Sequence, residues 1–175
     1  QAVLSPFIRC GVRCLDDVFS RVSGTALQGG YMVVIQTHGR NGPYNPHLHI
    51  IATSGGWDRQ SRQWIHLDYL PYPIVRKKWQ WYLLTMLRQT VKTQEIQRLV
   101  DTCYTRYREG FVTNVQQGDV PSRYQSLATY LAKYVVSPPI SLRRIDRYDG
   151  QRVTYHYRSH KSERVERETV TVYTF

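Results

Sequence analysis

The stretch that decides the fold is YMVVIQTHGRNGPYNPHLHIIAT, residues 31–53. Its first part, YMVVIQTHG, and its last part, PHLHIIAT, are rich in β-branched and aromatic residues, which is typical of strands. Between them, GRNGPYN is dense in turn-forming residues. Two strands joined by a loop of this length predict an antiparallel hairpin. Histidine is an unusual residue for such a strand, so His47 and His49 need an explanation.

The two histidines stand two residues apart, so on a strand their side chains point to the same face, about 7 Å apart at Cα. Leu48 and Ile50 then point to the opposite face and can enter the core. Histidine is the commonest metal-binding side chain, so the pair could hold one divalent ion. The alternative is a half-exposed strand with two outward polar residues, and an isolated His-x-His favours this alternative.

A metal site at the histidine pair needs further ligands. The preceding strand offers Gln36 and His38, which share one face by the same alternation. Either could be the third ligand if that face is the one that bears the histidines. Asn41 and Asn45 in the loop are weaker candidates.

The rest of the chain mixes helices and strands. Amphipathic or proline-initiated patterns predict helices over residues 6–19, 73–90, 94–107 and 121–136. Turn-bounded, β-rich patterns predict an exposed hairpin over 54–69, a short strand at 110–115 and a meander of two or three strands over 140–175. Hairpins mixed with helices indicate one α+β domain, in which helices flank a central antiparallel sheet.

A second pair of residues, Tyr130 and Tyr134, lies in the segment YLAKY. Four residues apart on a helix, the two rings are neighbours on one face. At about 100° per residue they fall on the flank of the helix's apolar stripe, where their hydroxyls could reach a cleft. The alternative is that both are core aromatics. A phenol has a pKa near 10 and needs help to attack a phosphodiester, and a metal that polarises the phosphate can provide that help.

Charge and aromatic content indicate a polyanionic partner. Lys and Arg outnumber Asp and Glu by 24 to 13, the formal charge is +11, and there are 14 Tyr and 4 Trp. Aromatic side chains among basic ones suit unpaired bases better than lipid headgroups. We expect a nucleic-acid partner, and the candidates for contacts to DNA phosphates are Lys133, Arg143, Arg144 and Arg147. The run RSHKSERVERE at 158–168 mixes both signs and is more typical of an ordinary solvated surface.

The sequence carries no membrane or targeting signal. No apolar run approaches the ~20 residues that cross a bilayer, and no leader-like start is present. Cys10, Cys14 and Cys103 lack the spacing of a zinc knuckle, so we expect small buried residues in a reducing cytosol. Because the chain starts at Gln1 without Met and stops inside TVTVYTF, we expect it to be an internal piece of a longer protein.

These motifs and their order resemble a known family. QTHGRNGPYNPHLHIIATSGG (36–56), followed by YLAKYVVSPPISLRRIDRYDGQRVTYHYR (130–158), is similar to the two-tyrosine transposases of the insertion sequence 91 type. These belong to the HUH endonucleases, named for histidine, bulky hydrophobe and histidine, here His47-Leu48-His49. The paired tyrosines of the family match Tyr130 and Tyr134, and the resemblance extends from about Gly30 to the end.

The resemblance implies a ferredoxin-like or RRM-like sheet with the histidines on a central strand and the tyrosines on an adjacent helix. It implies chemistry on single-stranded DNA with Mg²⁺ or Mn²⁺, and imidazoles suit Mn²⁺ better. The histidines would hold the metal, and one tyrosine would attack to give a 5′-phosphotyrosine and a free 3′-OH. A second tyrosine would let a second strand be cut before the first is released, as in rolling-circle transposition.

The resemblance also implies a location and a division of the chain. Bacterial transposases act in the cytoplasm, at the nucleoid, and their N-terminal zinc-binding region does not occur within these 175 residues. We predict a helical lead-in over 1–29, a catalytic domain over 30–158 and a C-terminal strand of a truncated continuation over 159–175. The alternative function is a non-catalytic single-stranded nucleic-acid-binding module, or an inactive remnant of a transposase, with salt-sensitive binding that needs no metal.

Overall fold

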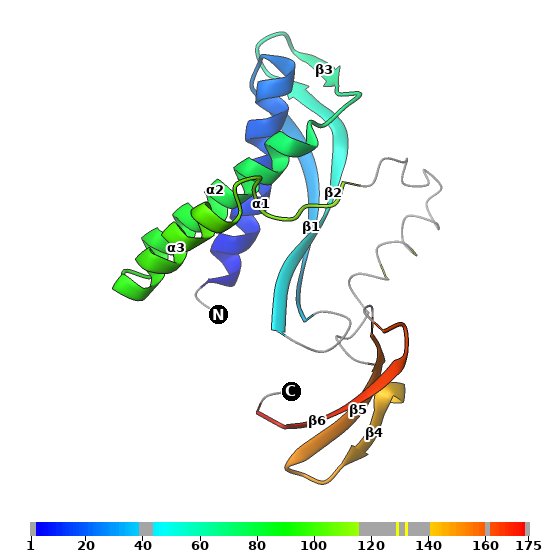
Figure 1. Ribbon diagram of the computed structural model, residues 1–175. Coiled ribbons are helices and arrows are strands. Elements are labelled where there is room, and N and C mark those ends of the chain that lie inside the picture. The colour runs from blue at the N-terminus through cyan, green and yellow to red at the C-terminus, as the bar shows by residue number, and fades with distance from the viewer. Residues whose placement is uncertain are drawn as a thin grey trace. The chain divides into compact units, whose positions relative to one another are not determined.

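The computed structural model describes residues 3–38, 44–115, 129, 132, 141–159 and 162–173, shown as coloured ribbon in Figure 1. Its elements in chain order are α1 (Leu4–Ser23), β1 (Leu27–His38), β2 (Tyr44–Asp58), β3 (Gln63–His66), α2 (Tyr72–Thr90), α3 (Gln94–Arg106), the 3₁₀ turn η1 (Leu142–Arg144), β4 (Ile145–Tyr148), β5 (Arg152–Arg158) and β6 (Val165–Thr171). The predicted α+β class is confirmed. The strands within these described ranges form two three-stranded sheets, β1-β2-β3 and β4-β5-β6, instead of one central sheet.

The chain divides into two compact units. The first takes in Gln1–Val33 and Ile50–Gly118, and the second takes in Val34–His49 and Asp119–Phe175. The boundary therefore cuts both β1 and β2. Helices α1, α2 and α3 belong to the first unit, whereas the histidine pair and the β4-β5-β6 sheet belong to the second.

Helix α1 forms because its apolar residues recur every three or four positions. Phe7, Cys10, Cys14 and Val18 lie along this stripe and are all buried. The helix ends at Gly24, whose φ of 76° is a left-handed conformation that glycine adopts without steric cost. The helix predicted over 6–19 is thus confirmed and is longer at both ends.

Two neighbours cover α1. On the α2 side, the ring of Phe7 packs against Trp79 with centroids 5.4 Å apart. On the β1 side, Phe19 packs against Tyr31 at 5.9 Å, and the Tyr31 hydroxyl donates to Asp16 at 2.8 Å. Burial and this hydrogen bond raise the pKa of Tyr31. The core of the first unit is therefore centred on α1.

Helix α3 packs on α2 through a buried amide. The side chain of Gln80 donates to the backbone carbonyls of Cys103 and Tyr107, at 3.3 and 3.0 Å, which satisfies a polar group in the core. Thr93 caps the start of α3 by accepting from the backbone N–H of Ile96 at 3.3 Å. The helices predicted over 73–90 and 94–107 are both confirmed.

The strand predicted at 110–115 is wrong. This segment is irregular because side chains of α2, and not a neighbouring strand, bind its carbonyls. Arg76 donates from Nε to the carbonyl of Phe111 at 3.3 Å and from Nη2 to the preceding carbonyl at 3.3 Å. The hydroxyl of Tyr72 donates to the carbonyl of Thr113.

The exposed hairpin predicted over 54–69 is confirmed as the pairing of β2 with β3. Asp58 closes its turn by accepting from the backbone N–H of Gln60 at 3.0 Å and from the hydroxyl of Ser61 at 2.6 Å. Trp57 lies directly opposite Trp64, so both rings are on one face of the hairpin. They are 43% and 49% exposed, which leaves two flat apolar rings open to solvent.

The second sheet is the meander predicted for the C-terminal part of the chain. Between β4 and β5, the carboxylate of Asp149 accepts from the backbone N–H groups of Gln151 and Arg152 at 2.9 and 2.6 Å. Gly150 follows it with a φ of 90°, as the Asp-Gly turn requires. Val153 and Tyr155 are the buried side chains of β5 and share one face of the sheet.

The cysteines are free thiols. Cys10 and Cys14 are buried and Cys103 is half-buried, as expected for small core residues. Burial raises the pKa of Cys14 to about 12. A thiol of this kind carries little thiolate at neutral pH and is therefore a packing residue.

Candidate functional site

The rings of His47 and His49 lie side by side on β2. Their centroids are 5.0 Å apart with an interplanar angle of 68°, and both side chains are half-buried. This is the same-face arrangement that strand alternation predicts. The second unit therefore presents two imidazoles at one spot.

A hydrogen bond selects the tautomer of His47. Its Nδ1 lies 2.7 Å from the backbone carbonyl of Asn45, and a carbonyl can only accept. In the neutral ring Nδ1 thus carries the proton, and Nε2 carries the lone pair that a metal needs. Asn45, a weaker candidate for a side-chain ligand, contributes here through its backbone.

Gln36 is the third side chain at this spot. Its Oε1 lies 3.2 Å from Nε2 of His49, which donates to it; a bound metal would replace this hydrogen bond, with the proton leaving Nε2. Burial lowers the pKa of His49, and the neighbouring His47 lowers it further, so the neutral ring is favoured. Both effects suit a metal ligand, because an imidazole must be neutral to coordinate.

His38, the alternative third ligand, makes other contacts. Its ring meets Tyr44 edge-on with centroids 5.8 Å apart, and its Nδ1 lies 2.9 Å from the hydroxyl of Thr37. Of the two candidates on β1, Gln36 is the one that the structure brings into contact with the histidine pair.

The chemistry of the three donors fits a divalent cation, and so does the spacing of two of them. Two ligand atoms at right angles, each ~2.1 Å from an ion, are about 3 Å apart, close to the 3.2 Å between Gln36 Oε1 and His49 Nε2. Two imidazoles and one amide oxygen suit Mn²⁺ better than Mg²⁺. Within the described ranges, no group of three or more His, Cys, Asp or Glu could hold a metal, whereas Gln36 places an amide oxygen beside the two imidazoles.

The predicted nucleophiles, Tyr130 and Tyr134, lie outside the described residues, and so does Lys133. Two residues of that segment, Thr129 and Ala132, are described; both are helical and exposed. The assignment of the tyrosines as nucleophiles stays a prediction.

The predicted DNA-contacting arginines are exposed side chains around the start of the second sheet. Arg143 and Arg144 lie in η1, which Ser141 caps by accepting from the backbone N–H of Arg143 at 3.4 Å. Arg147 lies in β4.

Among the described helices, none is long and apolar enough to cross a membrane.

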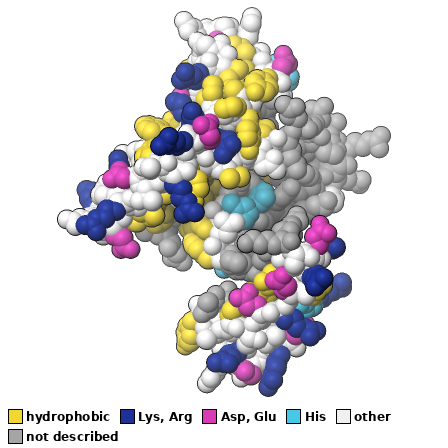
Figure 2. Space-filling view, viewed as in Figure 1, with side chains coloured by type: hydrophobic (Ala, Val, Ile, Leu, Met, Phe, Trp, Pro, Cys, Tyr) yellow, Lys and Arg dark blue, Asp and Glu magenta, His cyan; other side chains and the backbone are white. Residues whose placement is uncertain are grey.

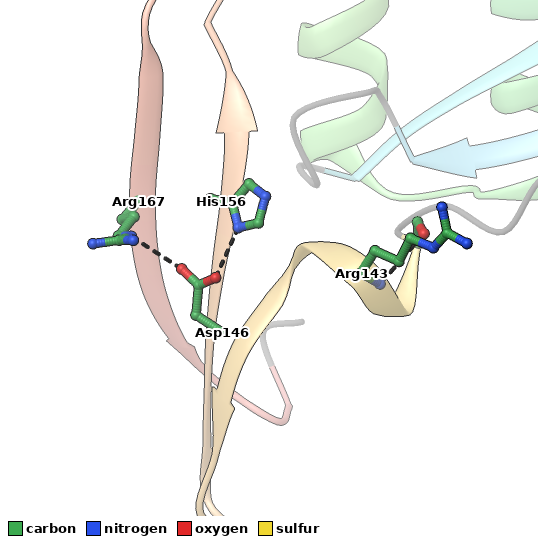
Figure 3. Close-up of polar contacts among 5 residues, drawn as sticks. Arg143, Asp146, His156 and Arg167 are labelled. Atoms are coloured by element: carbon green, nitrogen blue, oxygen red, sulfur yellow. Dashed lines mark hydrogen bonds and ion pairs between the residues drawn. The ribbon is translucent and has the colours of Figure 1, made fainter.

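Sequence reasoning missed a polar cluster in the second sheet, drawn in Figure 3. The two carboxylate oxygens of Asp146 bind Nδ1 of His156 at 2.8 Å and Nε of Arg167 at 3.0 Å. Both partners lower the pKa of Asp146, His156 more than Arg167. Three strands each contribute one member, and a bulge between Ile145 and Arg147 turns Asp146 toward the other two. A bulge leaves no clear signal in one sequence.

Comparisons with known proteins extend these observations. A family model described as "Putative transposase" matches residues 30–175. The transposase for insertion sequence element IS801 of Pseudomonas savastanoi pv. phaseolicola is 24% identical over 168 residues, which cover 89% of this chain and 40% of that protein. The chain thus spans less than half the length of this curated relative. No solved structure matches the chain.

Proposed function

The chain belongs to the transposase family whose model matches residues 30–175, and from that premise we propose that it nicks and rejoins single-stranded DNA with a divalent metal. The resemblance to transposases is thereby confirmed at the level of the family. The observation that carries the proposal further is the convergence of His47, His49 and Gln36 on one spot.

These three residues would hold the cation. His47 presents Nε2 because the carbonyl of Asn45 keeps the proton on Nδ1. His49 and Gln36 face each other at a distance that one ion can bridge. When bound, a divalent cation would withdraw charge from a scissile phosphate and so make it more electrophilic. The two strands, held in one sheet, keep the donors in place before DNA arrives.

Tyr130 or Tyr134 would supply the nucleophile. The phenol oxygen forms a bond to phosphorus, the bond from phosphorus to O3′ breaks, and the proton of the phenol ends on the 3′-oxygen. The products are a 5′-phosphotyrosine and a free 3′-OH, with no water consumed. Reversal by a different 3′-OH rejoins the strand, and the second tyrosine allows two such intermediates at once, which suits rolling-circle transposition.

The single-strand part of the proposal is supported by the β2–β3 hairpin. Trp57 and Trp64 share one face and are both exposed, and Arg59 and Arg62 lie in the turn between them. Exposed aromatic rings beside basic side chains are typical of surfaces that stack unpaired bases.

The test is covalent capture of DNA. The chain is incubated with Mn²⁺ and a library of single-stranded oligonucleotides that have a randomised core and a label at the 3′ end, because the 5′-phosphotyrosine keeps the 3′ part. We expect a labelled protein band that survives denaturing electrophoresis. The double variant Tyr130→Phe with Tyr134→Phe should lose it, whereas Tyr148→Phe, an exposed tyrosine on β4 that is 63% accessible, should keep it.

A band that persists in the double phenylalanine variant would show that the nucleophile is assigned wrongly. A parent chain that binds the library, with or without a metal chelator, and forms no band would favour the non-catalytic binding module.

A further inference from the structure

One face of the β4-β5-β6 sheet gathers arginines from all three strands. The register pairs Arg147 with Thr154, His156 with Arg167, and Arg158 with Val165, and side chains two residues apart share a face. We propose that this face binds the sugar-phosphate backbone of nucleic acid. We call it the arginine face and define it by Arg147, Arg152, Arg158 and Arg167, which are all exposed.

The charges of β6 are sorted by strand alternation. Glu166, Arg167 and Glu168 follow one another in sequence, so the arginine points to one face and both glutamates point to the other. The hydrogen bonds agree, since Glu168 accepts from the hydroxyl of Tyr155 at 3.0 Å and Glu166 from that of Tyr157 at 3.2 Å. Within the mixed-sign run predicted to be an ordinary solvated surface, the part from Glu166 to Glu168 therefore separates its two signs.

Asp146 holds the middle of the arginine face in place. It is the one carboxylate there among the described strand residues, and it binds His156 and Arg167. In the adjoining turn, Arg147 and Arg152 help to lower the pKa of Asp149. The Arg167 side chain remains 76% exposed although its Nε is bound. An anchored guanidinium of this kind can still offer its outer nitrogens to a phosphate. In Figure 2, dark-blue and magenta side chains both appear on this sheet.

The chemistry of the face selects its partner. On β5, side chains two residues apart repeat about every 6.6 Å, roughly twice the 3.4 Å rise per phosphate of one DNA strand. The hydroxyls of Thr154 and Thr169, 2.9 Å apart, lie among the arginines and can also bind phosphate oxygens. Among the described residues on this face only Val165 is aliphatic, which suits a polar backbone better than a lipid surface.

This inference rests on the proposed function only in taking DNA as the nucleic acid, and it concerns residues away from the metal donors. The measurement is the fluorescence anisotropy of a labelled oligo-dT, in EDTA, over a series of salt concentrations. All proteins carry the Tyr130→Phe and Tyr134→Phe changes, so binding alone is observed.

The test variant is R147Q/R152Q/R158Q, which leaves Arg167 and its contact to Asp146 intact. Each lost phosphate contact on a single strand lowers the slope of log K against log salt by ~0.7, so we expect a slope smaller by about 2 and affinity lower on the order of 10- to 100-fold at 0.1 M salt. The control K92Q/R98Q/R108Q removes the same charge from exposed positions of the first unit and should keep the parent slope. A variant with lysine at positions 147, 152 and 158 should have the salt dependence of the parent protein again.

An unchanged slope in the test variant, or an equal loss in the control, would overturn the proposal. So would a test variant that loses only its binding to phosphatidylserine vesicles. In the parent protein, oligo-dT should protect these arginines from phenylglyoxal, a readout that needs no variant to fold; full modification despite bound oligo-dT would also overturn it. The covalent-capture assay is separate, so a chain that forms no adduct contradicts the proposed function and leaves the anisotropy result standing.

Discussion

The backbone carbonyl of Asn45 decides which nitrogen of His47 is available, and this single contact leaves Nε2 with the lone pair that the proposed metal site needs. Strand alternation alone predicted that the two rings share a face. The tautomer depends on the backbone conformation just before His47, and the choice of Gln36 over His38 depends on how β1 and β2 align. The local pattern of residues predicts neither the tautomer of His47 nor the choice between Gln36 and His38.

The three proposed donors predict which substitutions should weaken the binding of Mn²⁺. Mn²⁺ binding, followed by the loss of the free-ion signal in electron paramagnetic resonance, should weaken tenfold or more when His47, His49 or Gln36 is changed to Ala, since each removes one of three donors. His66→Ala is the control, because His66 is an exposed histidine on β3 whose ring nitrogen lies 3.6 Å from the carboxylate of Asp68. Equal Mn²⁺ affinity in the Gln36 variant would remove the amide from the ligand set.

At the scale of elements, what the sequence predicts well is what local periodicity controls. The three described helices and the turn between β4 and β5 follow from amphipathic spacing, an initial proline and an Asp-Gly pair. The irregular segment at 110–115 was mistaken for a strand because its carbonyls are bound by Arg76 and Tyr72, which are more than thirty residues away. The sorted charges of β6 required the register with β5, which a single strand does not reveal.

The β2–β3 hairpin supports a prediction about base stacking. The double variant Trp57→Ala with Trp64→Ala should weaken the binding of oligo-dT by roughly 1–3 kcal/mol for each base that loses the tryptophan on which it stacks. The binding of double-stranded DNA should weaken less. Trp81→Ala is the control, since Trp81 is also 49% exposed but lies on α2. Anisotropy titrations measure all of these. Equal losses in both variants would mean that the hairpin is no special platform.

At the scale of the whole molecule, acid should act more strongly on the second unit, where the pKa values of Asp146, Asp149 and Glu166 are lowered, than on the first, where the pKa of Asp58 is lowered. In the second unit, hydrogen bonds from His156 lower the pKa of Asp146, and those from the N–H groups of Arg152 and then Gln151 lower the pKa of Asp149. A lowered carboxyl pKa stabilises the fold above the ordinary value of 3.8. That stability is lost as the pH falls through the lowered value.

The four tryptophans make this difference measurable, because all of them lie in the first unit. Circular dichroism reports the unfolding of both units, whereas tryptophan fluorescence reports the first. Between pH 7 and pH 3, we expect the midpoint temperature of thermal unfolding to fall more when it is measured by circular dichroism than when it is measured by tryptophan fluorescence. In D146N/D149N the dichroism transition should already be lower at pH 7 and should shift less on acidification. Coincident transitions at every pH would show instead that the units unfold together.

The alternation of glutamate and arginine in β6 also governs which changes of length the strand tolerates. One residue inserted after Val165 would exchange the faces of everything that follows, so Glu166 and Glu168 would move to the arginine face, opposite His156 and Thr154 of β5. An insertion of two residues would restore the original polarity. Lineages related to this chain should therefore accept gaps in this strand in even steps, and odd steps should come with exchanged signs at neighbouring positions.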